Sequence, residues 1–439
     1  MSRDPKALDK INMGRTSASY KLTHGLGYVA KKRLVLDMQL YPFSLNVDEC
    51  FSNNNQKVFS IMVAYFSPEK GETVVHHYNS ISLTTVNAKI LKETLMSLLK
   101  SDNIPLHNLV SILCDSTNYM RGKKGGFETL VRNEASHLLD IDGDTCHHIH
   151  NASKLFCKYF DGIIEGLTDD WHTDAKFSTD LREYLREICE ILEVPFHMPR
   201  KRVPHRWLSV HDVLDEMIDP LTVLYWAWLP KNDKSMYQNI LNDILGLSQK
   251  NLKRIAAIVQ ACRDKNLTEQ GKARKQRVVK KLFHTRDITL LYIHTYLSVL
   301  PLLKSFILTF EQKAPMAHRI HDEQLSLLTS FLSTFIKQEK MKDITAKDLA
   351  NVDLDKKENH QELLEIFLGL KARKILQKKR SVPNPLMDQF LPTLKAYVDT
   401  AKYLLKKLPI TNPLLRRLGA IDPVALTTQC HCISSKETA

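Results

Sequence analysis

The sequence has no long uninterrupted hydrophobic run, no Cys/His cluster near its start and no short internal repeat. The apolar stretches at residues 221–229 and 290–303 are short or carry polar groups, so we expect no membrane-spanning segment and no membrane partner. The polar N-terminus predicts no signal peptide, because no apolar segment follows it. The missing repeat argues against a solenoid, and the missing cluster argues against a zinc finger ahead of the first strand.

Cysteine is sparse, with 8 residues scattered through a chain of 439. That distribution is typical of free thiols in a reducing compartment. One short group, Cys430, His431 and Cys432, has the residue types of a metal site. The alternative interpretation is a polar tail with chance thiols, and we favour it.

Positive charge is abundant: 62 Lys and Arg face 49 Asp and Glu, a formal net charge of +13. This excess favours an anionic partner, most simply DNA, but gives no information about the fold. The hydrophobic fraction of 43% is that of a globular protein. The length allows two or three domains with a sizeable core.

The pattern of residues 41–162 predicts a mixed α/β domain. Apolar residues alternate with polar ones through Phe43, Leu45 and Val47, the period of a half-buried strand. Short loops then join further strands in an antiparallel meander, and helices follow. We predict strands at residues 41–50, 57–66, 73–83, 109–114 and 145–149, and helices at 86–100, 125–139 and 151–160.

Two of these strands end at an aspartate. Asp48 interrupts the alternation of the first strand, on or next to a face that we expect to be dry, and Asp115 follows the fourth strand. A buried carboxylate must be hydrogen-bonded, paired or bound to a metal. Two carboxylates delivered to one place are half of a metal site for phosphoryl transfer. The alternatives are a strand-end turn for Asp48 and a helix or turn cap for Asp115.

From residue 163 to 425 the pattern is helical throughout, which predicts a large all-helical domain. Residues 1–40 form a basic, partly helical segment with a helix near residues 28–38, and residues 426–439 a flexible tail. Two basic runs, at residues 272–286 and 371–380, interrupt the helical region, and each is either a solvated helix face or a phosphate-contacting surface. The basic run that we predict to contact DNA is the first one, with Lys272, Arg274, Lys275, Arg277, Lys280 and Lys281.

Several short motifs resemble the hAT superfamily of DNA transposases, and more closely the animal proteins derived from them that have lost mobility. They are collinear and cover most of the chain. The motifs are Gly14–Tyr20 (GRTSASY), Pro42–Cys50 (PFSLNVDEC), Cys114–Asn118 (CDSTN), Cys146–Ala152 (CHHIHNA), Pro204–Ser209 (PHRWLS), Lys407–Leu415 (KLPITNPLL) and Asp422–Pro423.

The resemblance implies an RNase H-like core with strand order 3-2-1-4-5, followed by a large helical insertion. It implies that Asp48 and Asp115 match two of the three carboxylates that bind Mg²⁺ or Mn²⁺. It also places His147 near the active site, and Trp207 at the DNA. The alternative for Trp207 is a buried anchor at a helix start. The neighbouring Arg206 can pair with a phosphate or with an acidic residue such as Asp212. Asp144 stands where the family often has a cysteine. This departure weakens a zinc site made of Cys146, His147, His150 and Cys157.

No residue resembles the family's third carboxylate, because Glu437 lies in a polar tail. We therefore expect a transposase-derived, catalytically inactive nuclear protein that binds DNA or serves as an interaction platform. One alternative is an active metal-dependent nuclease or transposase with an unrecognised third carboxylate. Another is a protein-interaction scaffold without nucleic-acid binding. If the last core helix is missing, one sheet face should be exposed, which predicts self-association.

Overall fold

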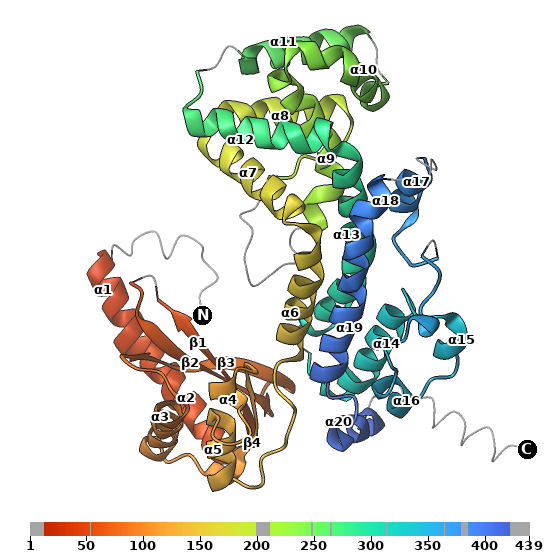
Figure 1. Ribbon diagram of the computed structural model, residues 1–439. Helices are drawn as coiled ribbons and strands as arrows, with labels where there is room; N and C mark the ends of the chain where they lie inside the picture. The colour runs from red at the N-terminus through yellow and green to blue at the C-terminus, as the bar shows by residue number, and fades with distance from the viewer. Residues whose placement is uncertain are drawn as a thin grey trace, which may run out of the picture. The chain divides into compact units, whose positions relative to one another are not determined.

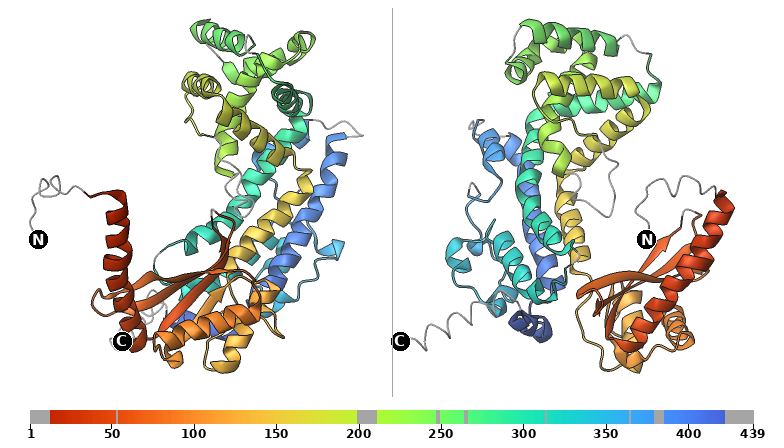
Figure 2. Two further views of the ribbon diagram at one scale, coloured as in Figure 1. Left: turned by 90° about the vertical axis from the view of Figure 1, so that its left-hand side faces the viewer. Right: turned by 180° about the vertical axis from the view of Figure 1, so that it is seen from behind.

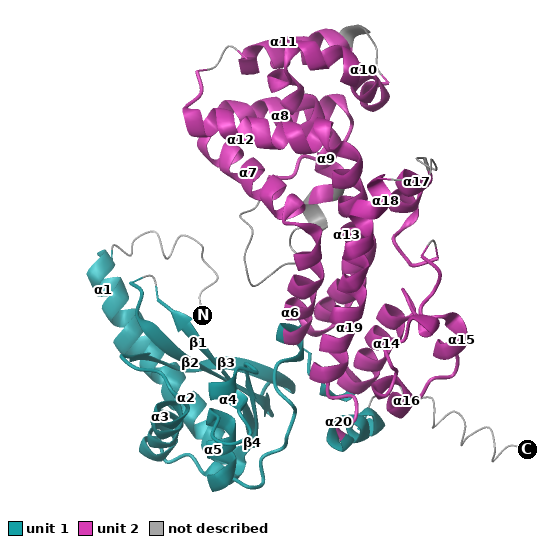
Figure 3. Cartoon of the chain, viewed as in Figure 1, with its two compact units in different colours: residues 1–147, 312–318, 413–439 teal, residues 148–311, 319–412 magenta. Residues whose placement is uncertain are grey.

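The computed structural model describes residues 13–52, 54–198, 211–246, 249–263, 266–312, 314–363, 365–378 and 385–421. The chain divides into two compact units (Figure 3). Unit 1 comprises residues 1–147, 312–318 and 413–439, and unit 2 comprises 148–311 and 319–412. The first boundary therefore follows His147, earlier in the chain than the predicted boundary at residue 162. The predicted tail, 426–439, and the Cys430 group lie outside the described residues.

Unit 1 contains a four-stranded mixed sheet with strand order β3-β2-β1-β4 (Figure 1). The strand β1 (Phe43–Phe51) pairs antiparallel with β2 (Lys57–Ser67), which pairs antiparallel with β3 (Glu72–Leu83). The helix α3 (Ala88–Ser101) then precedes β4 (Leu109–Cys114), which pairs parallel with β1. A mixed sheet with this order of four strands agrees with the prediction.

The predicted fifth strand at residues 145–149 is wrong, because this segment begins the helix α6 (Thr145–Cys157). Its buried residues Ile149, Ala152 and Phe156 recur at helical spacing. In the described chain only an isolated parallel bridge, between Ser111 and Leu139, extends this sheet beyond β4, and a second isolated bridge joins Ile336 to His360 in unit 2. The helix predicted at residues 125–139 is shorter in the structure, where it spans Phe127–Glu134.

One face of the sheet carries the core of unit 1. Alternate strand residues such as Phe59 and Ile61 are fully buried, and helices α2 (Gly27–Leu40), α3 and α5 (Phe127–Glu134) supply their partners. The rings of Phe59 and Phe127, for example, meet edge to face at 5.8 Å. The other face is only partly covered, and Phe66 and Val75 there are 56% exposed.

Unit 2 is helical, as predicted. In its lower half in Figure 1, α6, α13 (Arg286–Phe310), α14 (Ile320–Leu332) and α19 (Lys395–Lys407) run side by side. Buried aromatic rings hold them together, with Phe156 of α6 at the centre of the cluster. The upper half consists of α7 (Ile163–Phe177) and the helices that surround it, which Figure 2 shows from two further sides.

The helix α13 is long and apolar enough to cross a membrane by length and composition alone. However, 56% of its apolar window is buried inside the protein, so the helix is weak evidence for a membrane span. The helix predicted over residues 359–378 covers only α17 (Leu370–Lys378). Residues before it pair with the turn that follows α14 instead: Gln361 N donates to Phe335 O and Phe367 N to Thr334 O, each at 2.8 Å.

The other described elements complete the chain. They are α1 (Arg15–Tyr20), the π-helix η2 (Lys21–Leu26), η3 (Leu106–Asn108), α4 (Asn118–Arg121), η4 (Lys158–Phe160), α8 (Thr179–Ile191), α9 (His211–Tyr225), η6 (Trp226–Trp228), α10 (Lys231–Leu245), α11 (Gln249–Arg263), α12 (Glu269–Val279), the π-helix η7 (Lys280–His284), η8 (Ala317–Arg319), α15 (Gln338–Met341), α16 (Ala346–Ala350), η9 (Lys357–Asn359), α18 (Pro385–Phe390), η10 (Leu391–Leu394), α20 (Pro413–Leu418) and η11 (Gly419–Ile421).

Candidate functional site

The parallel pairing of β1 and β4 brings Asp48 and Asp115 to the same edge of the sheet. The last paired residues of the two strands are Val47 and Cys114. Each aspartate is the next residue of its chain segment, so both follow the ladder at its carboxyl end. Asp48 lies on the opposite face from the buried Val47 and is exposed. Of the two expected positions, Asp48 therefore lies next to the dry face and not on it, since strand alternation turns its side chain to the open side.

A histidine and a third aspartate adjoin this pair. His147 Nε2 lies 3.4 Å from Asp115 Oδ1. Asp144 accepts a hydrogen bond from His147 N at 3.1 Å and so caps the first turn of α6. Asp144 N in turn donates to Cys114 O at 3.3 Å, which ties the start of this helix to the end of β4.

The electrostatic environment raises the pKa of Asp48 above its ordinary value of 3.8. Desolvation is the main cause, because neighbouring groups displace water that would stabilise the anion. The N–H of Glu49 opposes the shift, the negative charges of Asp115 and Asp144 add to it, and His147 lowers it again. Asp48 thus belongs to an acidic cluster in which Asp115 and Asp144 disfavour its ionisation.

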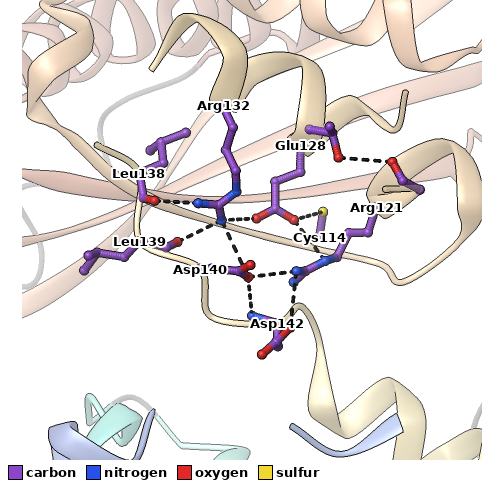
Figure 4. A network of polar contacts seen from close by, with 10 residues as sticks. Cys114, Arg121, Glu128, Arg132, Leu138, Leu139, Asp140 and Asp142 are labelled. Carbon is purple, nitrogen blue, oxygen red and sulfur yellow. Dashed lines mark hydrogen bonds and ion pairs between the residues drawn. The ribbon is translucent and has the colours of Figure 1, made fainter. Parts of the chain in front are cut away.

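The loop between β4 and α6 is held by a network of charged residues (Figure 4). Glu128 of α5 is buried and accepts from Arg132 Nη2 at 2.6 Å. Its other oxygen lies 3.0 Å from Arg121 Nε, and Arg121 Nη2 donates to Asp140 at 2.9 Å. Burial, and next the charge of Glu128, raises the pKa of the Cys114 thiol to about 12, so this thiol stays protonated. The network fixes the segment that carries Asp115.

Sequence reasoning missed this network. One signal was available, because Glu128 and Arg132 are four residues apart on a predicted helix, the spacing of an ion pair. The partners Arg121 and Asp140 come from loops, and no periodicity relates them to α5.

The cluster is a poor fit for a pair of divalent metal ions. Asp115 Oδ1 and Ser116 Oγ are buried without a hydrogen bond, and such hard oxygen atoms suit Mg²⁺ or Mn²⁺. However, within the described part of the chain no three His, Cys, Asp or Glu side chains are grouped so as to hold a metal ion. This finding also covers Cys146, His147, His150 and Cys157. Arg121 Nη1, also without a hydrogen bond, adds positive charge near Ser116.

The predicted DNA-contacting run lies on α12 and η7, and most of its members contact acidic residues. Arg274 and Lys275 both contact the buried Asp174 of α7. Lys275 is itself buried, so it faces the protein interior. Lys272 pairs with Glu269, and Arg277 pairs with Asp170. Lys280 is exposed. Burial lowers the pKa of Lys281.

Arg206 and Trp207 lie outside the described residues. Of the nine residues predicted to contact DNA, the structure therefore describes seven: His147 beside Asp115, and the six of the basic run. Three of them, Lys272, Arg277 and Lys280, are exposed.

The chain was compared with protein-family models and with curated proteins. No family model matches it. No curated protein matches it either. The resemblance to hAT transposases therefore depends on the quoted motifs alone.

The raised pKa of Asp48 predicts that Asp48→Asn stabilises unit 1 at neutral pH. In the folded state the carboxyl binds its proton more tightly than in the unfolded state, so its ionisation lowers stability as the pH rises above 3.8. The side-chain amide of asparagine carries no charge, so the substitution removes this loss of stability. Because Asp48 is exposed, we expect a gain below about 1 kcal/mol.

Hydrogen exchange of the β1 amides at several pH values would measure the gain. The gain should shrink as the pH falls below 3.8, because the carboxyl then becomes protonated in both the folded and the unfolded state and is uncharged like the amide. Glu72→Gln at the exposed start of β3 is the control. Faster β1 exchange in Asp48→Asn at neutral pH would contradict the prediction.

Proposed function

We propose that the chain is a transposase-derived nuclear protein that binds DNA through unit 2 and no longer cleaves it. The observation that carries the proposal is the register of β1 and β4, which puts Asp48 and Asp115 side by side after the Val47–Cys114 pair. The collinear hAT-like motifs match these two positions. A fold-level likeness alone would support a common ancestor and not an activity.

The loss of cleavage is inferred from the ligands. Two-metal phosphoryl transfer needs carboxylates that hold both ions on either side of the reacting phosphate. Asp48 and Asp115 supply two, and Asp144 uses one oxygen to cap α6. The imidazole of His147 lies against Asp115 Oδ1, a buried oxygen that makes no hydrogen bond.

DNA binding is inferred from charge. The formal charge of +13 belongs to the whole chain, and Lys272, Arg277 and Lys280 of one helical segment are exposed. The ion pairs of Arg274 and Lys275 with Asp174 anchor this segment to α7. A helix held in place by these ion pairs can present its exposed basic residues to phosphates without a further loss of backbone entropy.

Binding to a random DNA duplex across a salt series tests this function. Each phosphate contact contributes a slope of about −0.9 in log affinity against log salt. We expect Lys272→Ala/Arg277→Ala/Lys280→Ala to weaken binding and reduce the slope by up to about 3. The matched control is Lys340→Ala/Lys342→Ala/Lys347→Ala, at exposed lysines of another part of unit 2.

Absence of binding even at low salt would refute the DNA-binding role and favour a scaffold. An equal loss in both triple variants would show that only net charge matters. Cleavage of the duplex with Mg²⁺ or Mn²⁺, abolished by Asp48→Asn and by Asp115→Asn, would instead establish an active nuclease.

A further inference from the structure

The helical segment at residues 15–40 is a continuous rod formed by α1, η2 and α2, of which only one end packs on the sheet (Figure 2). Leu34 and Met38 are its buried residues, and Lys31 lies over the ring of Tyr78 at 5.7 Å. Asp37 accepts a hydrogen bond from Tyr65 OH at 2.6 Å. These contacts define the face of the rod that serves the core of unit 1.

The opposite face carries a second apolar stripe that the core does not use. Its residues are Leu22, Leu26, Val29, Leu36 and Leu40, and at least half of each side chain is exposed. From Leu26 onward the stripe positions, including Arg33, alternate by three and four residues, the spacing of a heptad seam. At 1.5 Å per residue the stripe is about 25 Å long.

A stripe of this kind needs a partner. Scattered exposed leucines are ordinary on protein surfaces, but apolar residues that recur along one helix face, here interrupted by Arg33, mark an interaction site. Helical recognition commonly uses anchors at positions i, i+3 or i+4 and i+7, and Leu26, Val29 and Arg33 followed by Leu36 and Leu40 supply that pattern.

The charges of the rod indicate the chemistry of the partner. Five basic residues, Arg15, Lys21, Lys31, Lys32 and Arg33, accompany one acidic residue. That residue, Asp37, is engaged by Tyr65 on the sheet side. Arg33 forms an exposed pair with Glu69, and no ion pair in the described chain joins Lys21 or Lys32 to a carboxylate.

We propose that this stripe binds an amphipathic helix of another protein, with an apolar ridge flanked by Asp and Glu. Arg33 already pairs with Glu69, so the acidic flanking residues complement Lys21 and Lys32, and opposite charges beside a helical seam select the partner. A second copy of the chain would bring like charges together. A membrane surface fits less well, because the stripe is a narrow row of Leu and Val, whereas interfacial helices carry a broad apolar face with Trp or Phe. This inference is independent of the proposed DNA binding.

Binding of a synthetic peptide to the full-length protein would test the proposal. The probe has about four heptads with Leu at positions a and d and Glu at e and g. We expect micromolar binding that weakens as salt is added. Leu26→Glu/Leu36→Glu should lower the affinity at least about tenfold, since it places charge in the seam and repels the probe. A peptide with Lys in place of Glu should not bind.

The control protein is Phe177→Glu/Leu370→Glu, which makes the same kind of change at two more exposed positions of unit 2. Binding that the Leu26/Leu36 variant retains in full, or that the control loses equally, would overturn the proposal. Two other results would also overturn the proposal. One is a dimer, seen by light scattering, that dissociates in the Leu26→Glu/Leu36→Glu variant. The other is adsorption of the protein to anionic phospholipid vesicles that this variant loses, if the acidic peptide does not bind.

Discussion

Replacing Asp174 by alanine should destabilise unit 2 by about 3–5 kcal/mol, because it leaves a buried cation without its counter-ion. Asp174 is 4% exposed. It accepts hydrogen bonds from Arg274 Nε and Tyr225 OH, each at 2.5 Å, and also from Lys275. Lys275 lies over the ring of Trp228 at 4.8 Å and is buried as well. Water cannot replace the lost carboxylate there.

The same substitution should change the pH dependence of stability. Burial lowers the pKa of Lys275 below its ordinary value of 10.5, and the charge of Asp174 opposes that shift. Without Asp174 the pKa falls further, so the folded state binds this proton less tightly than the unfolded state. Stability therefore rises with pH between the folded pKa and 10.5. Asp174→Ala should regain part of its lost stability in alkaline solution.

Urea unfolding followed by tryptophan fluorescence would measure both effects for unit 2 alone. All of the tryptophans, Trp171, Trp207, Trp226 and Trp228, belong to this part of the sequence. Glu183→Ala is the control, because Glu183 pairs with Arg186 on an exposed helix surface and should cost less than about 1 kcal/mol. Asp174→Asn/Lys275→Met should recover stability relative to Asp174→Ala. Equal losses in Asp174→Ala and Glu183→Ala would refute the argument.

Truncating Phe156 to alanine should cost about 3–5 kcal/mol in the same measurement. The side chain is fully buried where α6, α13, α14 and α19 meet. Its ring centroid lies 5.2 Å from that of Tyr397 and 5.3 Å from that of Phe160. Aromatic rings surround the resulting cavity, and they belong to different helices, so they cannot all move to fill it.

Two further variants separate the cavity from other effects. Phe156→Leu keeps most of the volume and should cost clearly less than Phe156→Ala. Phe177→Ala removes a ring that is 75% exposed and should be close to neutral. A loss in Phe156→Ala no larger than in Phe177→Ala would mean that this cluster does not hold the helices together.

Much of the fold of unit 1 could be predicted because its signals are local. The alternation in β1 and the turn after β2 specify an antiparallel meander, and the apolar spacing of α3 specifies a crossover to β4. Residues 145–149 were assigned wrongly because β-branched Thr145 and Ile149 resemble a strand in a short window. The helix depends on Asp144 as its cap and on buried residues further along, at Ala152 and Phe156.

The candidate site could be predicted only in part, for a related reason. The strand ends point to Asp48 and Asp115, since parallel neighbours in a sheet end at one edge. No periodicity predicts that Asp144 caps α6, or that Glu128 holds Arg121 and Arg132 together. The basic run wrongly predicted that Lys275 contacts DNA. A run of charged residues gives no sign that one of them is buried in an ion pair with Asp174, which is distant in the sequence.

The pairing of β1 with β4 also has a consequence for the order of folding. The two hairpin-like pairings join segments that are close in the chain, whereas the parallel ladder joins residues near 45 to residues near 112. Contacts of long sequence separation form late, because the entropy of closing the intervening loop must be lost first. The acidic edge therefore comes into existence only when β4 docks, after the meander has formed. During synthesis on the ribosome, Asp48 therefore emerges before Asp115, the carboxylate that will lie beside it in the folded protein.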